Sequence, residues 1–200
     1  MSKIKEMTLD EIKKELGYDF VIVQERSKVK LGSKNRGDIF IGPDGREWLF
    51  VKAVDGGVCA ITTKFVFERE QFDNDTNNLA EANVLKRLQG KILPEIGEDN
   101  VKEMEIDLTT LDGLKDYGTV KTKIGLPTYQ FYVDNQDVIA PVLAELDDWA
   151  WLANALSTPK RDVQYGTLCV TPQGNVSWYF CNCHYGVLAF CIFDSEILVS

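Results

Sequence analysis

Alternating apolar and polar residues in the first third of the chain predict short antiparallel strands. β-Branched and aromatic residues gather in three runs, residues 38–41, 47–51 and 58–67. Gly42-Pro43-Asp44-Gly45 and Asp55-Gly56-Gly57 separate these runs, and such Gly, Pro and Asp clusters are typical of tight turns between strands. We therefore expect an antiparallel meander over this region.

A helix is expected near the N-terminus. Thr8-Leu9-Asp10-Glu11 is a capping box, in which the Thr8 and Glu11 side chains each accept a bond from the other residue's backbone N–H. Ile12 and Leu16 then lie four residues apart, and Gly17 is a suitable end. We assign residues 1–36 to this helix and an extension, and residues 37–200 to a single domain.

Two further segments have the spacing of amphipathic helices. Apolar residues recur every three or four positions from Leu79 to Ile92, which predicts a helix that ends near Pro94. Leu126-Pro127-Thr128 is expected to begin another helix, carrying aromatic residues at positions 129, 131 and 132, with a short helical turn over residues 138–143. The mixture of hairpins and two or three helices predicts an α+β fold.

The C-terminal region predicts another hairpin, residues 165–170 against 176–180, joined by Thr171-Pro172-Gln173-Gly174-Asn175. Period-two alternation assigns one parity of this hairpin to the core and the other to the opposite face. The expected core set is Leu168, Val170, Val176, Trp178 and Phe180. The expected outward set is Thr167, Cys169, Thr171, Ser177, Tyr179 and Cys181.

The segment that follows combines two cysteines with the only histidine of the chain, in Cys181-Asn182-Cys183-His184. Thiolate and imidazole are ligands that Zn²⁺ prefers, so a zinc site completed by Cys169 or Cys191 is one alternative. A cysteine nucleophile with His184 as its base is another, although neighbouring side chains on an extended segment point apart. Because structural zinc usually takes ligands in spaced pairs and no second histidine exists, we expect neither a metal nor a cofactor.

Other chemical motifs are missing or incomplete. The oxygen-rich stretch Asp73–Asn78 lacks the Gly at position six and the Glu at position twelve of an EF-hand loop. The chain also contains no Gly-x-Ser-x-Gly elbow and no Gly-rich phosphate-binding loop. We therefore expect no catalytic residues and a protein that is not an enzyme.

The charge and the hydropathy of the chain limit the classes of partner and the cellular locations that we expect. The net charge of -9 repels phosphate backbones and anionic membranes, so we expect a protein partner and no direct contact with nucleic acid or membrane. The sequence has neither a membrane-length apolar run nor the apolar core of a signal peptide, which predicts a location in the cytoplasm of a host cell or in a virion. In such a place the five cysteines are expected to be reduced thiols.

Several short motifs resemble those of an uncharacterised family of bacterial and phage domains. Members of that family end in Trp-Trp-Leu-(Arg/Ala)-(Ser/Thr)-Pro, a Tyr-Val-x-x-x-Gly-x-Val-Ser hairpin and Gly-Val-Arg-Pro. The matching motifs here are Trp149-Ala150-Trp151-Leu152-Ala153, Gly174-Asn175-Val176-Ser177 and Gly186-Val187, with Asn77–Glu81, Asp107–Leu114 and Leu126–Thr128 before them. The resemblance covers roughly residues 38–200, but Leu188-Ala189 replaces Arg-Pro and Asn154-Ala155 replaces the earlier Ser/Thr-Pro.

That family is similar to the C-type-lectin-like fold of formylglycine-generating enzymes and of the variable proteins of diversity-generating retroelements. The resemblance implies an α+β domain whose last strands and loops display a ligand-binding surface. The residues at the displayed positions are Asn154, Tyr179, Cys181, Asn182, His184 and Tyr185.

The resulting expectation is a non-enzymatic recognition protein of phage or mobile-element origin that binds a macromolecular partner through its C-terminal hairpin and loops. Two alternatives stay open. One is an acidic anti-defence protein, similar in action to an anti-CRISPR, whose carboxylates occupy the phosphate groove of a host nuclease. The other is a metalloprotein or enzyme that uses Cys181, Cys183 and His184.

Overall fold

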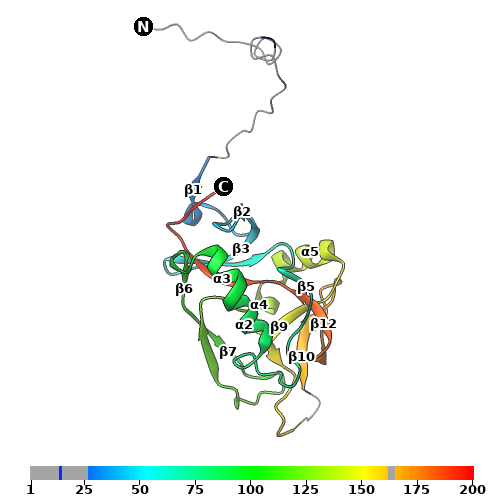
Figure 1. Cartoon of the computed structure of the whole chain (residues 1–200). Coiled ribbons are helices and arrows are strands. Elements are labelled where there is room, and N and C mark those ends of the chain that lie inside the picture. Colours follow the sequence, from blue (N-terminus) through cyan, green and yellow to red (C-terminus); the bar gives the residue numbers. More distant parts are fainter. Residues whose placement is uncertain (1–13, 15–26, 162–164) are drawn as a thin grey trace, which may run out of the picture.

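The computed structural model describes Lys14, residues 27–161 and residues 165–200 (Figure 1). The helix expected over residues 8–17 therefore lies almost entirely outside the described residues. The described part is a mixed α+β structure with mostly antiparallel sheets and three helical segments. Among these residues, no helix is long and apolar enough to cross a membrane.

The first large sheet has five strands in the order β2-β3-β4-β13-β6. Its strands are β2 (Ile39–Ile41), β3 (Glu47–Val54), β4 (Gly57–Thr62), β6 (Val101–Lys102) and β13 (Phe190–Asp194). The register pairs Phe40 with Trp48 and Trp48 with Thr62, which confirms the meander expected in this region. Trp48 is fully buried and packs edge-on against Phe193 of β13.

The second large sheet has the order β11-β10-β9-β12-β5. Its strands are β5 (Phe67–Gln71), β9 (Ala150–Ala155), β10 (Gly166–Val170), β11 (Val176–Phe180) and β12 (His184–Val187). The run 58–67, expected to be one strand, is interrupted at residues 63–66, so β4 and β5 belong to different sheets. All six residues of β9 are buried, which places this strand in the interior.

Short elements complete the sheets. The strands β7 (Met104–Asp107) and β8 (Thr119–Thr122) form a separate antiparallel pair, and the 3-10 turns η1 (Leu31–Ser33) and η3 (Glu98–Asn100) precede β2 and β6. β1 (Val29–Lys30) pairs with β14 (Leu198–Val199), and Leu31 is fully buried. The end of the segment assigned to the N-terminal extension is thus part of the folded unit.

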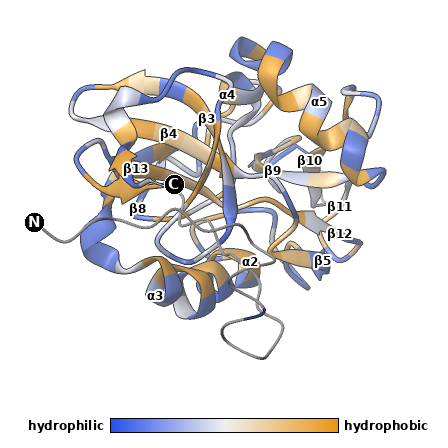
Figure 2. Cartoon of the chain, turned by 90° about the horizontal axis from the view of Figure 1, so that it is seen from above, coloured by the Kyte–Doolittle hydropathy of each residue, from blue (hydrophilic) through white to orange (hydrophobic). Residues whose placement is uncertain are grey.

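The helical segments flank the sheets, with α2 and α3 along one side and α4 and α5 along the other (Figure 2). The first segment runs through α2 (Asn83–Arg87), the π-helical turn η2 (Leu88–Ile92) and α3 (Leu93–Ile96). It starts later than expected and passes through Pro94, which lies in the first turn of α3 directly after the π-helical turn.

The other helices are α4 (Tyr129–Asp134) and α5 (Gln136–Leu146). Thr128 caps α4 by accepting a bond from the Phe131 N–H, as expected from the Leu-Pro-Thr signal. The short turn expected over residues 138–143 is instead an eleven-residue helix with Pro141 inside it. Its buried residues Ile139, Val142 and Leu143 recur at spacings of three and four.

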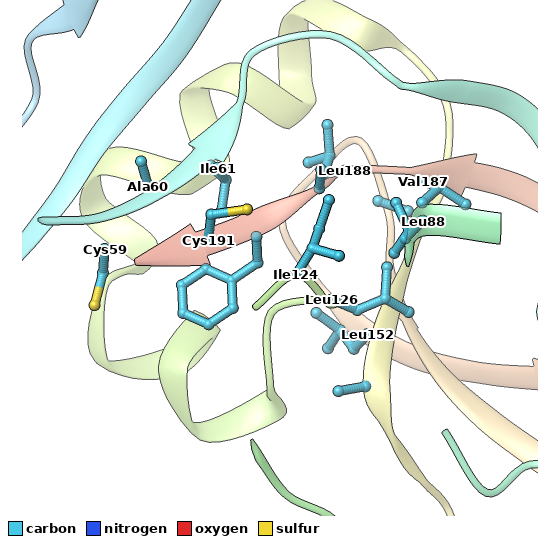
Figure 3. Packing of buried hydrophobic residues seen from close by; sticks show 14 of the residues in the cluster. Cys59, Ala60, Ile61, Leu88, Ile124, Leu126, Leu152, Val187, Leu188 and Cys191 are labelled. Atoms are coloured by element: carbon cyan, nitrogen blue, oxygen red, sulfur yellow. The ribbon is translucent and has the colours of Figure 1, made fainter. Parts of the chain in front are cut away.

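The link between β12 and β13 carries the chain from one sheet to the other. Leu188 and Ala189 lie in this link and are almost completely buried. The Ala189 N–H donates to Thr62 Oγ1, and Phe190 bridges Gly125. Figure 3 shows side chains from both sheets and from residues 124–126 gathered around this link. A buried arginine would need a charged partner here, so apolar residues suit the position.

Candidate functional site

The C-terminal hairpin forms with the expected turn and register. β10 and β11 pair Leu168 with Trp178 and Val170 with Val176. At the turn, the Gly174 N–H donates to the Thr171 carbonyl, and the positive φ of 79° at Gly174 favours glycine. A Cβ atom at Gly166 would lie 2.9 Å from the Trp178 ring, so glycine at position 166 lets that ring lie over the strand.

The assignment of faces on this hairpin was partly wrong. Trp178 and Phe180 were expected in the core, but they are 39% and 44% exposed. Thr167, Cys169, Thr171 and Cys181 were expected to face outward, but they are at most 8% exposed. The reason is topological: β10 has neighbours on both sides and is buried on both faces, whereas β11 is the outermost strand of its sheet.

Four of the expected site residues lie at the same end of the molecule. Tyr179 is 40% exposed and lies edge-on to Tyr185 at a ring distance of 5.4 Å. His184 is exposed and pairs with Gln71 of β5. Asn182 is also exposed, and its backbone carbonyl accepts a bond from Gln71 Nε2 at 2.9 Å. The turn between β11 and β12 thus brings residues 179–185 onto one rim of the second sheet.

Trp149 was not among the expected site residues, yet it belongs to this rim. Its ring stacks on Tyr185 at 5.5 Å and lies edge-on to Tyr179 at 5.2 Å. Burial raises the pKa of Tyr185 to about 12, and the nearby Asp148 carboxylate acts in the same direction. No local motif marks Trp149 as a neighbour of Tyr179, because β10 separates their strands in the sheet.

Asn154 has a different position and serves the interior. It is 6% exposed, and its side-chain amide donates to the Asp107 and Thr109 carbonyls at 3.0 and 2.9 Å. Its Oδ1 accepts from the Tyr129 N–H at 2.8 Å. Asn154 therefore joins β9 to the end of β7 and the start of α4, beside a cavity of about 340 Å³. All its contacts among the described residues are internal.

Four of the five cysteines, Cys59, Cys169, Cys181 and Cys191, lie in surroundings that raise the pKa of the thiol and favour its neutral form. All five are free. Burial raises the pKa of Cys169 to about 12, and burial together with Asp73 raises that of Cys181 to about 11. Since the thiolate is the nucleophile and metal ligand, these environments disfavour both roles for Cys181. Within residues 27–161 and 165–200, no three His, Cys, Asp or Glu residues are grouped to hold a metal ion.

The oxygen-rich segment before α2 also uses its polar groups internally. The Asp73 carboxylate accepts from the backbone N–H groups of Asp75 and Asn83, at 2.9 and 2.8 Å. The Asn77 side chain donates to the carbonyls of Ser157 and Gly166 and accepts from the Tyr117 hydroxyl. These side chains hold α2 and β10 in place.

A cavity of about 580 Å³ lies between β5 and the α2–η2 segment. Its basic residues include Lys86, Arg87 and Lys91. Arg87 forms an ion pair with Glu70 and lies over the Phe67 ring at 4.6 Å. The guanidinium is therefore already satisfied by neighbours in the same chain.

Comparisons with protein-family models, with curated proteins and with solved structures gave no match. The protein is therefore described from its own structure alone, as an α+β fold with an aromatic hairpin at the edge of a sheet. Its resemblance to the C-type-lectin-like fold stays a prediction.

Proposed function

We propose that this is a non-enzymatic recognition protein that binds a protein partner through β11 and the loop leading to β12. The observation that carries the proposal is the exposure of three consecutive aromatic residues, Trp178, Tyr179 and Phe180, at 39–44% each. Charged and small polar residues usually cover a sheet edge, so exposed aromatic side chains there favour an interaction surface.

The strand next to this surface is held in the sheet from both sides. β10 pairs with β9 and β11, and its five residues are all buried. Aromatic side chains have few rotatable bonds and bury large areas, which makes them effective anchors at protein interfaces. Asn182 and His184 add polar groups beside these anchors. The combination of aromatic and short polar side chains on this sheet suits recognition.

We further propose that the domain has the C-type-lectin-like fold and a phage or mobile-element origin. Both rest on the sequence motifs in residues 38–200 and on the position of the aromatic surface in the last strands of the chain. In variable proteins of that fold, the displayed residues also concentrate near the C-terminus.

The test uses the triple variant Tyr179→Ala, Asn182→Ala and His184→Ala. Tagged protein is incubated with host lysate, and proteins enriched over background are then tested as purified partners by direct titration. The triple variant is expected to lose binding while its thermal unfolding stays close to that of the unchanged protein, because the three residues are exposed or half-exposed.

A matched control replaces exposed apolar residues on other elements. Ile39, Leu111 and Val133 are 42–54% exposed and lie outside the hairpin. Their simultaneous replacement by Ala is expected to leave partner binding intact. If the triple variant binds the partner as tightly as the unchanged protein does, the surface is wrongly assigned.

A further inference from the structure

The outer edge of β11 differs from the opposite edge of the same sheet. β5 forms that opposite edge and carries Glu68, Arg69 and Glu70. Charged side chains of this kind prevent a sheet edge from pairing with another strand. β11, with the sequence Val-Ser-Trp-Tyr-Phe, has no charge, no proline and no glycine. Its composition leaves the edge suited to receive a further strand.

The backbone of β11 points alternate groups away from β10. At the two ends of the ladder, the Thr171 N–H donates to the Asn175 carbonyl at 2.9 Å and the Cys181 N–H to the Tyr165 carbonyl at 3.1 Å. Hydrogen-bonded and non-bonded pairs alternate in an antiparallel ladder, so Ser177 and Tyr179 bond to β10. The peptide groups of Val176, Trp178 and Phe180 therefore point outward.

Most of these outward groups have no partner among the described residues. The Phe180 carbonyl accepts from the Cys183 N–H at 2.9 Å, which closes the turn to β12. The N–H and carbonyl of Trp178 make no such contact within residues 27–161 and 165–200. An added strand would satisfy them in the way that neighbouring strands do.

The two faces of this edge differ in chemistry. Trp178 and Phe180 share one face, with ring centroids 6.0 Å apart, and offer an apolar surface. Tyr179 lies on the other face, in contact with Trp149 and Tyr185. Asp148 precedes Trp149 directly. A cluster of aromatic rings next to a carboxylate is a favourable place for an ammonium or guanidinium group.

The charge of this part of the chain agrees with a basic ligand. Residues 124–200 contain eight acidic residues, at positions 134, 137, 145, 147, 148, 162, 194 and 196, and two basic ones, Lys160 and Arg161. Asp137, Asp194 and Glu196 form ion pairs with Arg36, Lys102 and Lys30, and the other five acidic residues still outnumber the basic ones. Lys160 forms an ion pair with Asp116, and Arg161 lies 3.6 Å from Asp112. A second copy of the chain would bring the same excess of negative charge, which opposes its approach.

We propose that the edge of β11 binds an extended segment of a partner protein in which basic and apolar residues alternate, as a sixth strand of the sheet. This inference rests on the proposed function and specifies its partner. Side chains of an added strand point alternately to the two faces of the sheet. The apolar residues lie against Trp178 and Phe180, and the lysine or arginine residues lie against Tyr179.

The probe is a fluorescent peptide of about eight residues that alternates arginine and valine, titrated against the whole protein by fluorescence anisotropy. Two control peptides are used. One replaces arginine by glutamate, and the other carries N-methyl groups on the residues whose N–H would face β11. The arginine–valine peptide is expected to bind saturably. Each control peptide is expected to bind with an affinity at least about tenfold lower. Binding should also weaken as salt rises to about 0.15 M.

Protein variants locate the contact. Trp178→Pro removes an N–H that points outward, so the hydrogen bonds between β11 and β10 stay intact. This variant is expected to bind the peptide with an affinity at least about tenfold lower. Tyr179→Ala is expected to reduce the preference for arginine over glutamate. Glu68→Ala on the opposite edge is the control and should not change the affinity. If Trp178→Pro does not fold, the N-methylated peptide carries the test of strand addition.

Four results would overturn the inference. Equal affinity for the N-methylated peptide would exclude strand addition, and equal affinity for the glutamate peptide would exclude a basic ligand. A dimer in sedimentation that Trp178→Pro dissociates would assign the edge to a second copy instead. Loss of partner binding in the triple variant, without any peptide binding, would leave the proposed function standing and remove only this inference.

Discussion

Replacing Asn154 by alanine gives the sharpest test of the site, because the sequence suggests a ligand-binding residue and the structure gives it an interior position. The change removes the hydrogen bonds to Asp107, Thr109 and Tyr129, at 2.8–3.0 Å. At a net contribution of about 1 kcal/mol each, the loss is about 3 kcal/mol.

Two effects change the expected loss of unfolding free energy in opposite directions. The freed backbone groups lose their partners, which raises the cost. The adjacent cavity of about 340 Å³ has several polar side chains in its lining and is large enough for water, which can bond to the freed groups and lower the cost. We expect the free energy of unfolding to fall by about 2–4 kcal/mol, which corresponds to a melting temperature lower by roughly 5–15 °C.

The assay is urea unfolding at neutral pH followed by tryptophan fluorescence, with calorimetry as a second measure. Asn182→Ala is the matched control, since the Asn182 side chain is exposed and only its backbone carbonyl is engaged. The reasoning is refuted if Asn154→Ala unfolds within about 0.5 kcal/mol of the unchanged protein. A loss of partner binding by Asn154→Ala at full stability would restore its role as a ligand-binding residue.

Further predictions concern packing and the thiols. Trp151→Ala should cost about 3–5 kcal/mol of unfolding free energy, because its ring is fully buried and its Nε1 donates to the Glu70 carbonyl, whereas Trp178→Ala should cost much less. Gly186→Ala should lower stability by about 1–3 kcal/mol, because the added Cβ would overlap the Phe65 ring, and Phe65→Leu in the same chain should recover part of that loss. The free energy of unfolding should fall as pH rises above 9. In the folded protein the pKa values of three buried thiols are raised from an ordinary 9.0 to about 11 or 12. The same thiols in the unfolded chain therefore lose their protons at lower pH, which favours the unfolded state as pH rises. Those thiols are Cys59, Cys169 and Cys181, and urea titrations at pH 7.5 and 10 check the slope; a flat response would contradict their burial.

Local signals predicted much of the fold. The turn residues Gly42–Gly45 and Asp55–Gly57 separate β2, β3 and β4 as expected, and Thr128 caps α4. These features depend on neighbours in sequence, because turn geometry and helix caps are fixed by a few adjacent residues. The C-terminal hairpin and its register follow from the same kind of signal.

The candidate site was predicted only in part. Tyr179, Asn182, His184 and Tyr185 do lie together, because two consecutive strands and the turn between them carry these residues. Asn154 lies elsewhere, and Trp149 joins the rim only through the pairing of distant strands. The alternation of side chains along β11 correctly separates Trp178 and Phe180 from Tyr179. This alternation does not reveal which face of the sheet is covered by other elements of the fold.

Local sequence patterns were enough to predict the α+β class, the positions of most strands and turns, and the excess of negative charge. The tertiary structure decided that β4 and β5 belong to different sheets, that β11 is an edge and that Asn154 is an interior bonding residue. The physical reason is that side-chain burial depends on what packs against an element from elsewhere in the chain. The same five residues would form a core strand between two neighbours, and at the edge their aromatic rings are exposed.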